Sequence, residues 1–263
     1  MRGAPRKPLL NIDSLTIYFG GVAAVHDISF QVEEGYIHAL IGPNGAGKTT
    51  ILNAVSGIYK PDAGNILFKN VNLTKLVPHQ ISRKGLSRTF QNIELFSSMT
   101  ALENIMVGMH TSVNAGFFSS ALSLKKSGAA ESEAVIKSNE VLKFLGLYPL
   151  SHQTAGDLPY GQQRLLELGR AIASKPKLLL LDEPAAGMNQ AEIKALIHLL
   201  REIRDRWGIT ILLVEHVMKL VMEISDRITV INFGVNIAEG TPEEIRNNTS
   251  VIDAYLGKER SVA

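Results

Sequence analysis

A glycine-rich segment between an apolar run and an amphipathic run constrains this chain more than any other feature. Residues 36–41 form a strand-sized apolar run, and residues 48–58 place apolar side chains at helical spacing. Between them, residues 42–49 have the spacing Gly-x-x-x-x-Gly-Lys-Thr, which binds phosphate where it joins a strand to a helix. The sequence therefore predicts a strand, a phosphate-binding loop and a helix in succession.

The residue types in this loop suit a bound triphosphate. Glycine lets successive backbone N–H groups turn toward one anion, and the following helix adds the positive end of its dipole. Lys48 can meet the β- and γ-phosphates, and Thr49 can hold Mg²⁺. A glycine-rich turn that binds nothing is the alternative, which the position and the Lys-Thr pair disfavour. The predicted nucleotide-binding residues here are Gly42, Pro43, Asn44, Gly45, Ala46, Gly47, Lys48, Thr49 and Thr50.

A second buried-strand pattern, residues 178–181, ends in two acidic residues, Asp182 and Glu183. Ligands of α/β sheets bind at the carboxyl ends of the strands. Asp182 is placed to orient Mg²⁺, and Glu183 can take a proton from an attacking water molecule. The alternative for both is a solvated strand end.

Strand and helix patterns alternate after this point. A helical face runs up to Trp207, and residues 209–214 and 227–232 are apolar strand candidates separated by a short helical segment, 217–224. This alternation favours an α/β fold, a P-loop NTPase core with a mainly parallel sheet covered by helices.

The flanks of this core differ from it. The first thirty-five residues carry apolar residues near period two, which predicts an antiparallel β edge. Residues 101–173 show no strong strand, whereas 131–147 and 161–173 read as amphipathic helices. We expect one domain, 1–263, with a nucleotide-binding core of 1–100 and 174–263 and an inserted helical subdomain of 101–173.

Composition excludes several classes of protein. The chain has 263 residues, no cysteine and a formal charge of +2. It therefore has no disulfides or thiolate metal sites, and its scattered basic residues give no nucleic-acid footprint. No apolar run reaches the roughly 18 residues of a membrane-spanning helix. Asn11 and Asp13 interrupt the segment where a signal peptide would be apolar, so we expect a cytoplasmic chain.

Residues 158–164, Leu-Pro-Tyr-Gly-Gln-Gln-Arg, precede a predicted helix and the carboxylate strand. They resemble the signature loop of ABC-type ATPases, and the resemblance extends along the whole chain. It implies, in chain order, an adenine-stacking Phe19, the phosphate loop, a Q-loop at Gln91, the signature residues Tyr160, Gly161 and Gln162, the acidic Asp182 and Glu183, a D-loop at Ala185 to Asn189, and a switch histidine, His216.

The resemblance assigns a role to each of these residues. Phe19 would stack on adenine, with Tyr18 as a rival and a core position at the sheet edge as the alternative. Gln91 would reach Mg²⁺ or the lytic water, unless it is a solvent-facing loop residue. His216 would donate a hydrogen bond to the γ-phosphate, unless it is a structural histidine. Lys48, Gln91, Glu183 and His216 are thus the predicted catalytic residues, and Thr49, Gln91 and Asp182 the predicted metal site.

In this family the signature loop acts on the partner subunit. Tyr160 and Gly161 would grip the γ-phosphate bound by the other copy, so that two ATP molecules join a head-to-tail dimer. Pro159 stands where the common signature has serine, and Tyr160 where it has glycine. One hydrogen-bond donor is therefore missing.

Several segments look most like the ATPase subunits of branched-chain amino acid importers, namely residues 163–164, 185–189, 215–219 and 237–245. Asn189 replaces the usual D-loop aspartate, and Val217 follows the switch histidine where an acidic residue is frequent. Details of coupling therefore do not transfer from those relatives.

The resemblance implies ATP and Mg²⁺ as cofactors, a second ATPase subunit (the same or a paralogue) and membrane-spanning permease subunits as partners, and indirectly a substrate-binding protein. It implies branched-chain or other small amino acids as the cargo. The expected location is the inner face of the cell membrane. An exporter ATPase is the nearest alternative. ABC-type ATPases that act on DNA or the ribosome carry insertions or a second cassette that do not fit here, and a nucleotide kinase would leave residues 158–164 unexplained.

Overall fold

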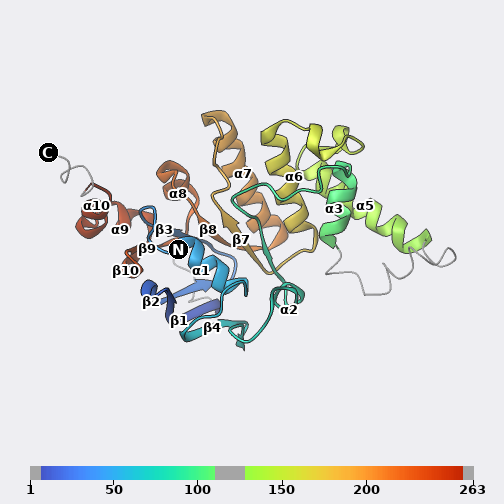
Figure 1. The fold of residues 1–263 in the computed structure, drawn as a ribbon. Helices are drawn as coiled ribbons and strands as arrows, with labels where there is room; N and C mark the ends of the chain where they lie inside the picture. The colour runs from blue at the N-terminus through green and yellow to red at the C-terminus, as the bar shows by residue number, and fades with distance from the viewer. Residues whose placement is uncertain (1–6, 110–127, 257–263) are drawn as a thin grey trace. The chain divides into compact units, whose positions relative to one another are not determined.

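The computed structural model describes residues 7–109 and 128–256 (Figure 1). The chain divides into two compact units. The first unit is Met1–Lys84 with Leu180–Ala263, and the second is Gly85–Leu179. The segment predicted as an inserted subdomain, 101–173, lies inside the second unit, and its bounds remain a prediction.

An antiparallel sheet forms at the beginning of the first unit. Its order is β2-β1-β4-β5, with Ile66 and Phe68 of β4 fully buried. The antiparallel edge predicted from period-two spacing is confirmed. The sequence analysis named neither β4, whose first three residues are Ala, Gly and Asn, nor β5, which has only two residues. The strands are β1 (Pro8–Phe19), β2 (Val22–Glu33), β4 (Ala63–Phe68) and β5 (Val71–Asn72).

A second, mainly parallel sheet has the order β10-β9-β3-β8-β7-β6. β3 pairs in parallel with β8 and β9, and β10 pairs antiparallel with β9. Every residue of β3, β7 and β8 is buried, as expected for strands covered on both faces. The predicted parallel core is confirmed. The strands are β3 (Ile37–Ile41), β6 (Leu86–Arg88), β7 (Leu178–Asp182), β8 (Thr210–Val214), β9 (Arg227–Asn232) and β10 (Val235–Gly240).

Helix α7 (Gln190–Trp207) shows how the sequence defines a helix in the first unit. The Asn189 side chain accepts hydrogen bonds from the first turn, and Gly208 ends the helix in the left-handed conformation. Its apolar face is buried as predicted. The other helices are α1 (Lys48–Val55), α2 (Pro78–Arg83), α8 (Met218–Ile224), α9 (Pro242–Arg246) and α10 (Thr249–Leu256).

The second unit is mainly helical (Figure 1). It contains α3 (Ala101–Gly108), α5 (Gly128–Phe144) and α6 (Tyr160–Ala173), whose contacts with one another build its core. The two helices predicted from periodicity are present. Thr100 and Glu103 form a capping box that begins α3. The helices of this unit were predicted from the spacing of apolar residues alone, so this cap did not contribute to the prediction.

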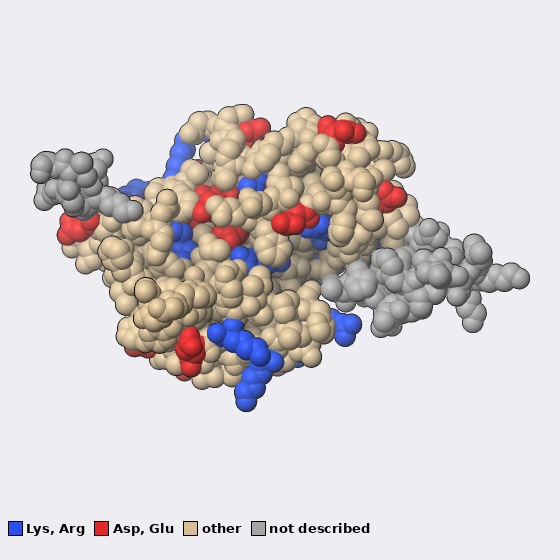
Figure 2. All heavy atoms as spheres, in the orientation of Figure 1, with Lys and Arg blue, Asp and Glu red and all other residues tan. Residues whose placement is uncertain are grey.

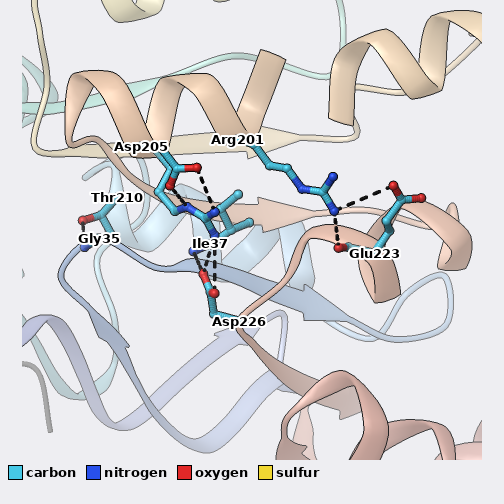
Figure 3. Close-up of polar contacts among 8 residues, drawn as sticks. Gly35, Ile37, Arg201, Asp205, Thr210, Glu223 and Asp226 are labelled. Carbon is cyan, nitrogen blue, oxygen red and sulfur yellow. Dashed lines mark hydrogen bonds and ion pairs between the residues drawn. The ribbon is translucent and has the colours of Figure 1, made fainter. Parts of the chain in front are cut away.

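Hydrogen bonds join the amino ends of the parallel strands to the last turn of α7 (Figure 3). The Asp226 carboxylate accepts a hydrogen bond from the Ile37 backbone N–H (2.8 Å) and from Arg204 Nη1 (3.1 Å). At the same edge the Gly35 N–H donates to Thr210 Oγ1. These contacts lie at the amino ends of the parallel strands, where contacts support the fold, and leave the carboxyl ends open for ligands.

The described part of the chain contains no helix that is long and apolar enough to span a bilayer. On the face drawn in Figure 2, acidic and basic side chains are interspersed. This mixture agrees with the small net charge of the chain.

Candidate functional site

The glycine-rich loop leaves β3 and turns directly into α1, as the sequence predicts. A Cβ atom at Gly42 would clash with the Ile231 carbonyl oxygen, and one at Gly47 would lie 2.6 Å from that of Ala24. Gly45 and Gly47 have φ values of +81° and +102°, which side-chain-bearing residues rarely adopt. Neighbouring backbone and conformation together therefore require glycine in this loop.

Lys48 begins α1 and is buried inside the loop. Its Nζ donates hydrogen bonds to the carbonyl oxygens of Gly42 (2.8 Å) and Pro43 (2.9 Å). Burial lowers the pKa of Lys48, while the charges of Glu183 and Asp182 oppose that shift. The ammonium group is thus held by backbone oxygens in a place where phosphate oxygens could take over as acceptors.

The rest of the loop presents polar groups at its surface. Asn44, Gly45 and Thr49 are exposed. Ala46 is buried, and its carbonyl accepts a hydrogen bond from the Gly234 N–H, which ties the loop to the turn between β9 and β10. The first N–H groups of a helix lack partners within the helix, so the start of α1 can face an anion.

The two predicted carboxylates follow one another at the end of β7. Asp182 is 1% exposed, and Glu183 is partly exposed. Glu183 has a φ of +52°, a conformation that is uncommon for a residue with a long side chain and that concentrates at functional sites. Its backbone N–H donates to the Val214 carbonyl (2.8 Å), which brings the ends of β7 and β8 together.

The hydrogen bond from the Glu183 N–H to the Val214 carbonyl brings Glu183 beside the predicted switch histidine, His216. Glu183 Oε1 lies 2.5 Å from His216 Nε2. His216 is the second residue after β8, and its side chain is 39% exposed. Two residues that the sequence analysis placed in one site thus form a hydrogen-bonded pair.

Glu215 is a residue of this site that the sequence analysis missed. Its carboxylate is buried, with Oε1 accepting from the Ala185 N–H (2.8 Å) and Oε2 from the N–H groups of His216 (2.7 Å) and Val217 (3.0 Å). It therefore joins the turn after Glu183 to the turn that carries His216. An acidic residue directly after a fully apolar strand was the signal, the same one that marked Asp182.

The second unit carries the remaining predicted residues. Gln91 and Tyr160 are exposed, while Gly161 and Gln162 are partly buried in the first turn of α6. Arg164 connects this turn to the Q-loop, because its Nη2 donates both to the Gln91 carbonyl (2.6 Å) and to Tyr160 Oη (2.9 Å). No pattern in the sequence marked Arg164 for this contact.

Aromatic side chains cluster at the end of β1. Phe19 is 46% exposed and meets Tyr59 edge to face, with ring centroids 5.2 Å apart. Tyr18 is equally exposed, and its backbone N–H donates to Asp62. Neither Phe19 nor Tyr18 is a core residue, so each offers a ring for stacking, and Tyr59 is a further aromatic that the sequence analysis did not name.

The residues proposed for Mg²⁺ offer oxygen donors. Over residues 7–109 and 128–256 there is no group of three or more His, Asp or Glu side chains that could hold a metal alone. The first unit supplies the Thr49 hydroxyl at the start of α1 and the Asp182 carboxylate, which influences Lys48 electrostatically. Such a sparse oxygen set fits Mg²⁺, which keeps several waters and binds largely through substrate phosphates.

The chain is similar to known proteins over most of its length. The family model described as ABC transporter matches residues 25–186, and the model described as branched-chain amino acid ATP-binding cassette transporter matches residues 235–261. The chain is 47% identical over 252 residues to the high-affinity branched-chain amino acid transport ATP-binding protein LivG of Salmonella typhimurium, covering 96% of this chain and 99% of that one.

Two solved structures are also similar. A nucleotide-free ATP-binding cassette from an ABC transporter superimposes with a TM-score of 0.82 at 34% identity. Another ATP-binding cassette of an ABC transporter, in its ADP conformation, gives 0.83 at 32%. Each alignment covers 95% of this chain and 99% of the other.

Proposed function

The chain belongs to the ABC transporter family of ATP-binding proteins, and on that premise we propose that it powers the import of branched-chain amino acids. ATP hydrolysis, the step that would power this import, is supported by the Glu183–His216 pair. The pair lies at the carboxyl ends of adjacent strands, in the unit that also holds the phosphate loop. The substrate class is supported by the relative LivG, whose name specifies branched-chain amino acid transport, and by the family model that matches residues 235–261.

The proposed reaction is the hydrolysis of ATP to ADP and phosphate. The oxygen of a water molecule attacks the γ-phosphorus, the bond to the β–γ bridging oxygen breaks, and Glu183 takes the proton of the water. His216 orients the Glu183 carboxylate and can donate a hydrogen bond to the γ-phosphate. Lys48 exchanges its loop carbonyls for phosphate oxygens when nucleotide binds.

The nucleotide would be held along the rest of the loop. We assign the phosphates to the loop N–H groups from Gly42 to Thr50 and the adenine to the exposed ring of Phe19. Thr49 and Asp182 would hold Mg²⁺, with Gln91 as a third contact. Bound there, the ion would neutralise charge on the β- and γ-phosphate oxygens.

The signature turn is assigned to the partner subunit's nucleotide. Tyr160, Gly161 and Gln162 would contact the γ-phosphate bound by a second ATPase subunit in a head-to-tail dimer. Pro159 contributes no hydroxyl there, so backbone N–H groups at the start of α6 and the helix dipole supply the attraction. The chain would lie at the inner face of the cell membrane, bound to membrane-spanning permease subunits, and a substrate-binding protein would deliver the amino acid.

Reconstitution tests this proposal. The chain is co-expressed with its membrane-spanning subunits, and ATP-driven movement of labelled leucine is measured in vesicles with Lys48→Ala as the inactive control. Accumulation that requires ATP and is lost in the control supports the proposal. ATP-driven movement of the amino acid in the outward direction, or no copurification with any membrane subunit, would overturn it.

A further inference from the structure

A buried charged pair lies in the second turn of α6. The side chains of Arg164 and Glu167 are only 6% and 3% exposed, and Arg164 Nη1 lies 3.7 Å from Glu167 Oε2. Burying two charges is unfavourable unless hydrogen bonds satisfy them. The hydrogen-bond partners of Arg164 and Glu167 therefore indicate which contacts offset the cost of burying these two charges.

The Arg164 guanidinium binds the Q-loop and the signature turn at once. Nη1 donates to the Phe90 carbonyl (3.2 Å) and Nη2 to the Gln91 carbonyl (2.6 Å). On its other side, Nε and Nη2 donate to Tyr160 Oη at 3.1 and 2.9 Å. A planar fork of five N–H groups can serve these acceptors together, which an ammonium group cannot.

Glu167 completes the contact from the same face of α6. Its Oε1 accepts a hydrogen bond from the Phe90 N–H (3.3 Å), so both polar groups of the Phe90 backbone are bound by this helix. Burial raises the pKa of Glu167, while the Phe90 N–H and the charge of Arg164 oppose that shift.

Tyr160 has a specific reason to be a tyrosine. It stands four residues before Arg164, so the two side chains lie on one face of the helix. The glycine of the common signature form could not reach the guanidinium. The phenol hydroxyl is bound by Arg164 while half of the Tyr160 side chain stays exposed, so the ring is presented at a defined position.

We propose that Arg164 is a positioning residue that couples the signature turn to the Q-loop, so that Tyr160 and Gln91 move together when nucleotide is bound. The coupling rests on the proposed function, since it affects turnover only if both loops act on ATP. It concerns residues of the second unit alone, and the phosphate loop that gives the isolated chain its nucleotide affinity belongs to the first unit.

The first test replaces Arg164 with lysine and measures two quantities on the purified chain. The Kd for ATP should stay within about twofold, whereas kcat for hydrolysis should fall about tenfold, the scale of one lost hydrogen bond to a charged group. Tyr160→Phe removes the hydroxyl that Arg164 binds and should also lower kcat. Because Arg164→Lys already breaks the contact with Tyr160 Oη that Tyr160→Phe removes, the double variant should be no slower than Arg164→Lys alone. Arg206→Lys, an exposed position on α7 paired with Glu202, is the matched control and should hydrolyse ATP as the wild type does.

The second test separates positioning from mere stability. Arg164→Met combined with Glu167→Leu exchanges the buried pair for apolar side chains of similar volume, a change that preserves or raises stability in other proteins. We expect a melting temperature at or above that of Arg164→Lys and a kcat that stays low. Recovery of kcat together with the melting temperature would overturn the proposal. So would a kcat unchanged in Arg164→Lys while the wild type hydrolyses ATP; a wild type that neither binds nor hydrolyses ATP would overturn the proposed function itself.

Discussion

The Glu183 carboxylate and the His216 imidazole lie in hydrogen-bond contact, Oε1 2.5 Å from Nε2, although 33 residues separate them in the chain. The contact follows from the way adjacent strands end. The Glu183 N–H binds the last carbonyl of β8, and Glu215 binds the backbone on both sides. Backbone hydrogen bonds thus set the positions of the residue that we propose as the base and of its proposed orienting partner.

Glu183→Gln tests the assignment of the base. Glutamine keeps a similar shape and can still bind His216, but it cannot accept a proton. We expect ATP binding to be retained and phosphate release to fall by about 10²- to 10⁴-fold, the usual contribution of a general base. Both are measured on the same preparation, by calorimetry and by a phosphate assay. Substantial remaining hydrolysis would remove Glu183 as the base.

Lys48→Ala tests the phosphate loop. The variant loses the ammonium group that now binds the Gly42 and Pro43 carbonyls, and with it a charge-assisted contact to phosphate. We expect the Kd for ATP to rise by about tenfold or more. Lys69→Ala, at an exposed lysine beyond β4, is the control and should bind ATP normally. Equal affinity in the two variants would contradict the role of Lys48.

Two glycines of the same loop should respond differently to alanine. A Cβ atom at position 42 would meet the Ile231 carbonyl oxygen, whereas at position 45 it would meet nothing within 4 Å. Gly45→Ala then incurs only the cost of its positive φ, about 1–2 kcal/mol. Gly42→Ala must displace backbone, so it should lose ATP binding and more stability. Thermal unfolding and nucleotide titration of both variants check this, and a Gly42→Ala protein as stable as Gly45→Ala would contradict it.

His38 should make the stability depend on pH. It is fully buried in β3, donates or accepts at Thr229 Oγ1 and stacks on Phe30. Burial, aided by the charge of Arg227, lowers the pKa of His38 from 6.5 to about 3. The unfolded chain therefore binds a proton first, and the free energy of unfolding falls as the pH drops from 6.5 toward 3, by up to about 1.4 kcal/mol per pH unit.

Urea titrations of the wild type and of His38→Gln between pH 7 and pH 4.5 measure this slope. The variant should be less stable at pH 7 but should lose less stability on acidification. Parallel curves for the two proteins would show that His38 does not carry the effect.

The elements that the sequence predicted well are the long or strongly apolar ones. Strand β9 has the predicted bounds, β7 extends one residue beyond the predicted apolar run, and α7 buries the predicted face. A fully buried strand and a regular amphipathic helix leave clear patterns in the sequence. Short elements such as β5 and α9 leave no such pattern. Their formation depends on neighbours in space, as for β5 on β4, or on a cap such as Thr241 at the start of α9.

The candidate site divides in the same way. The sequence patterns predicted the positions of Lys48 after β3 and of Glu183 after β7, and the structure places both residues there, while their chemical roles stay predictions. Glu215 carried a signal, an acidic residue directly after an apolar strand, but its contact with the Ala185 N–H forms only after folding. Arg164 carried no such signal, because the Gln91 carbonyl that it binds is distant in sequence. The aromatic cluster was predicted only in part, since the sequence singled out the Phe19 ring but not its edge-to-face neighbour Tyr59.

The left-handed backbone conformation of Glu183 sets stability against the proposed ATPase activity at one position of the chain. Glycine or asparagine would adopt this conformation with less strain, and either would remove the carboxylate that we propose as the base. A library screened for heat resistance alone should therefore accumulate inactive chains altered here, whereas one screened for transport should keep the strained glutamate.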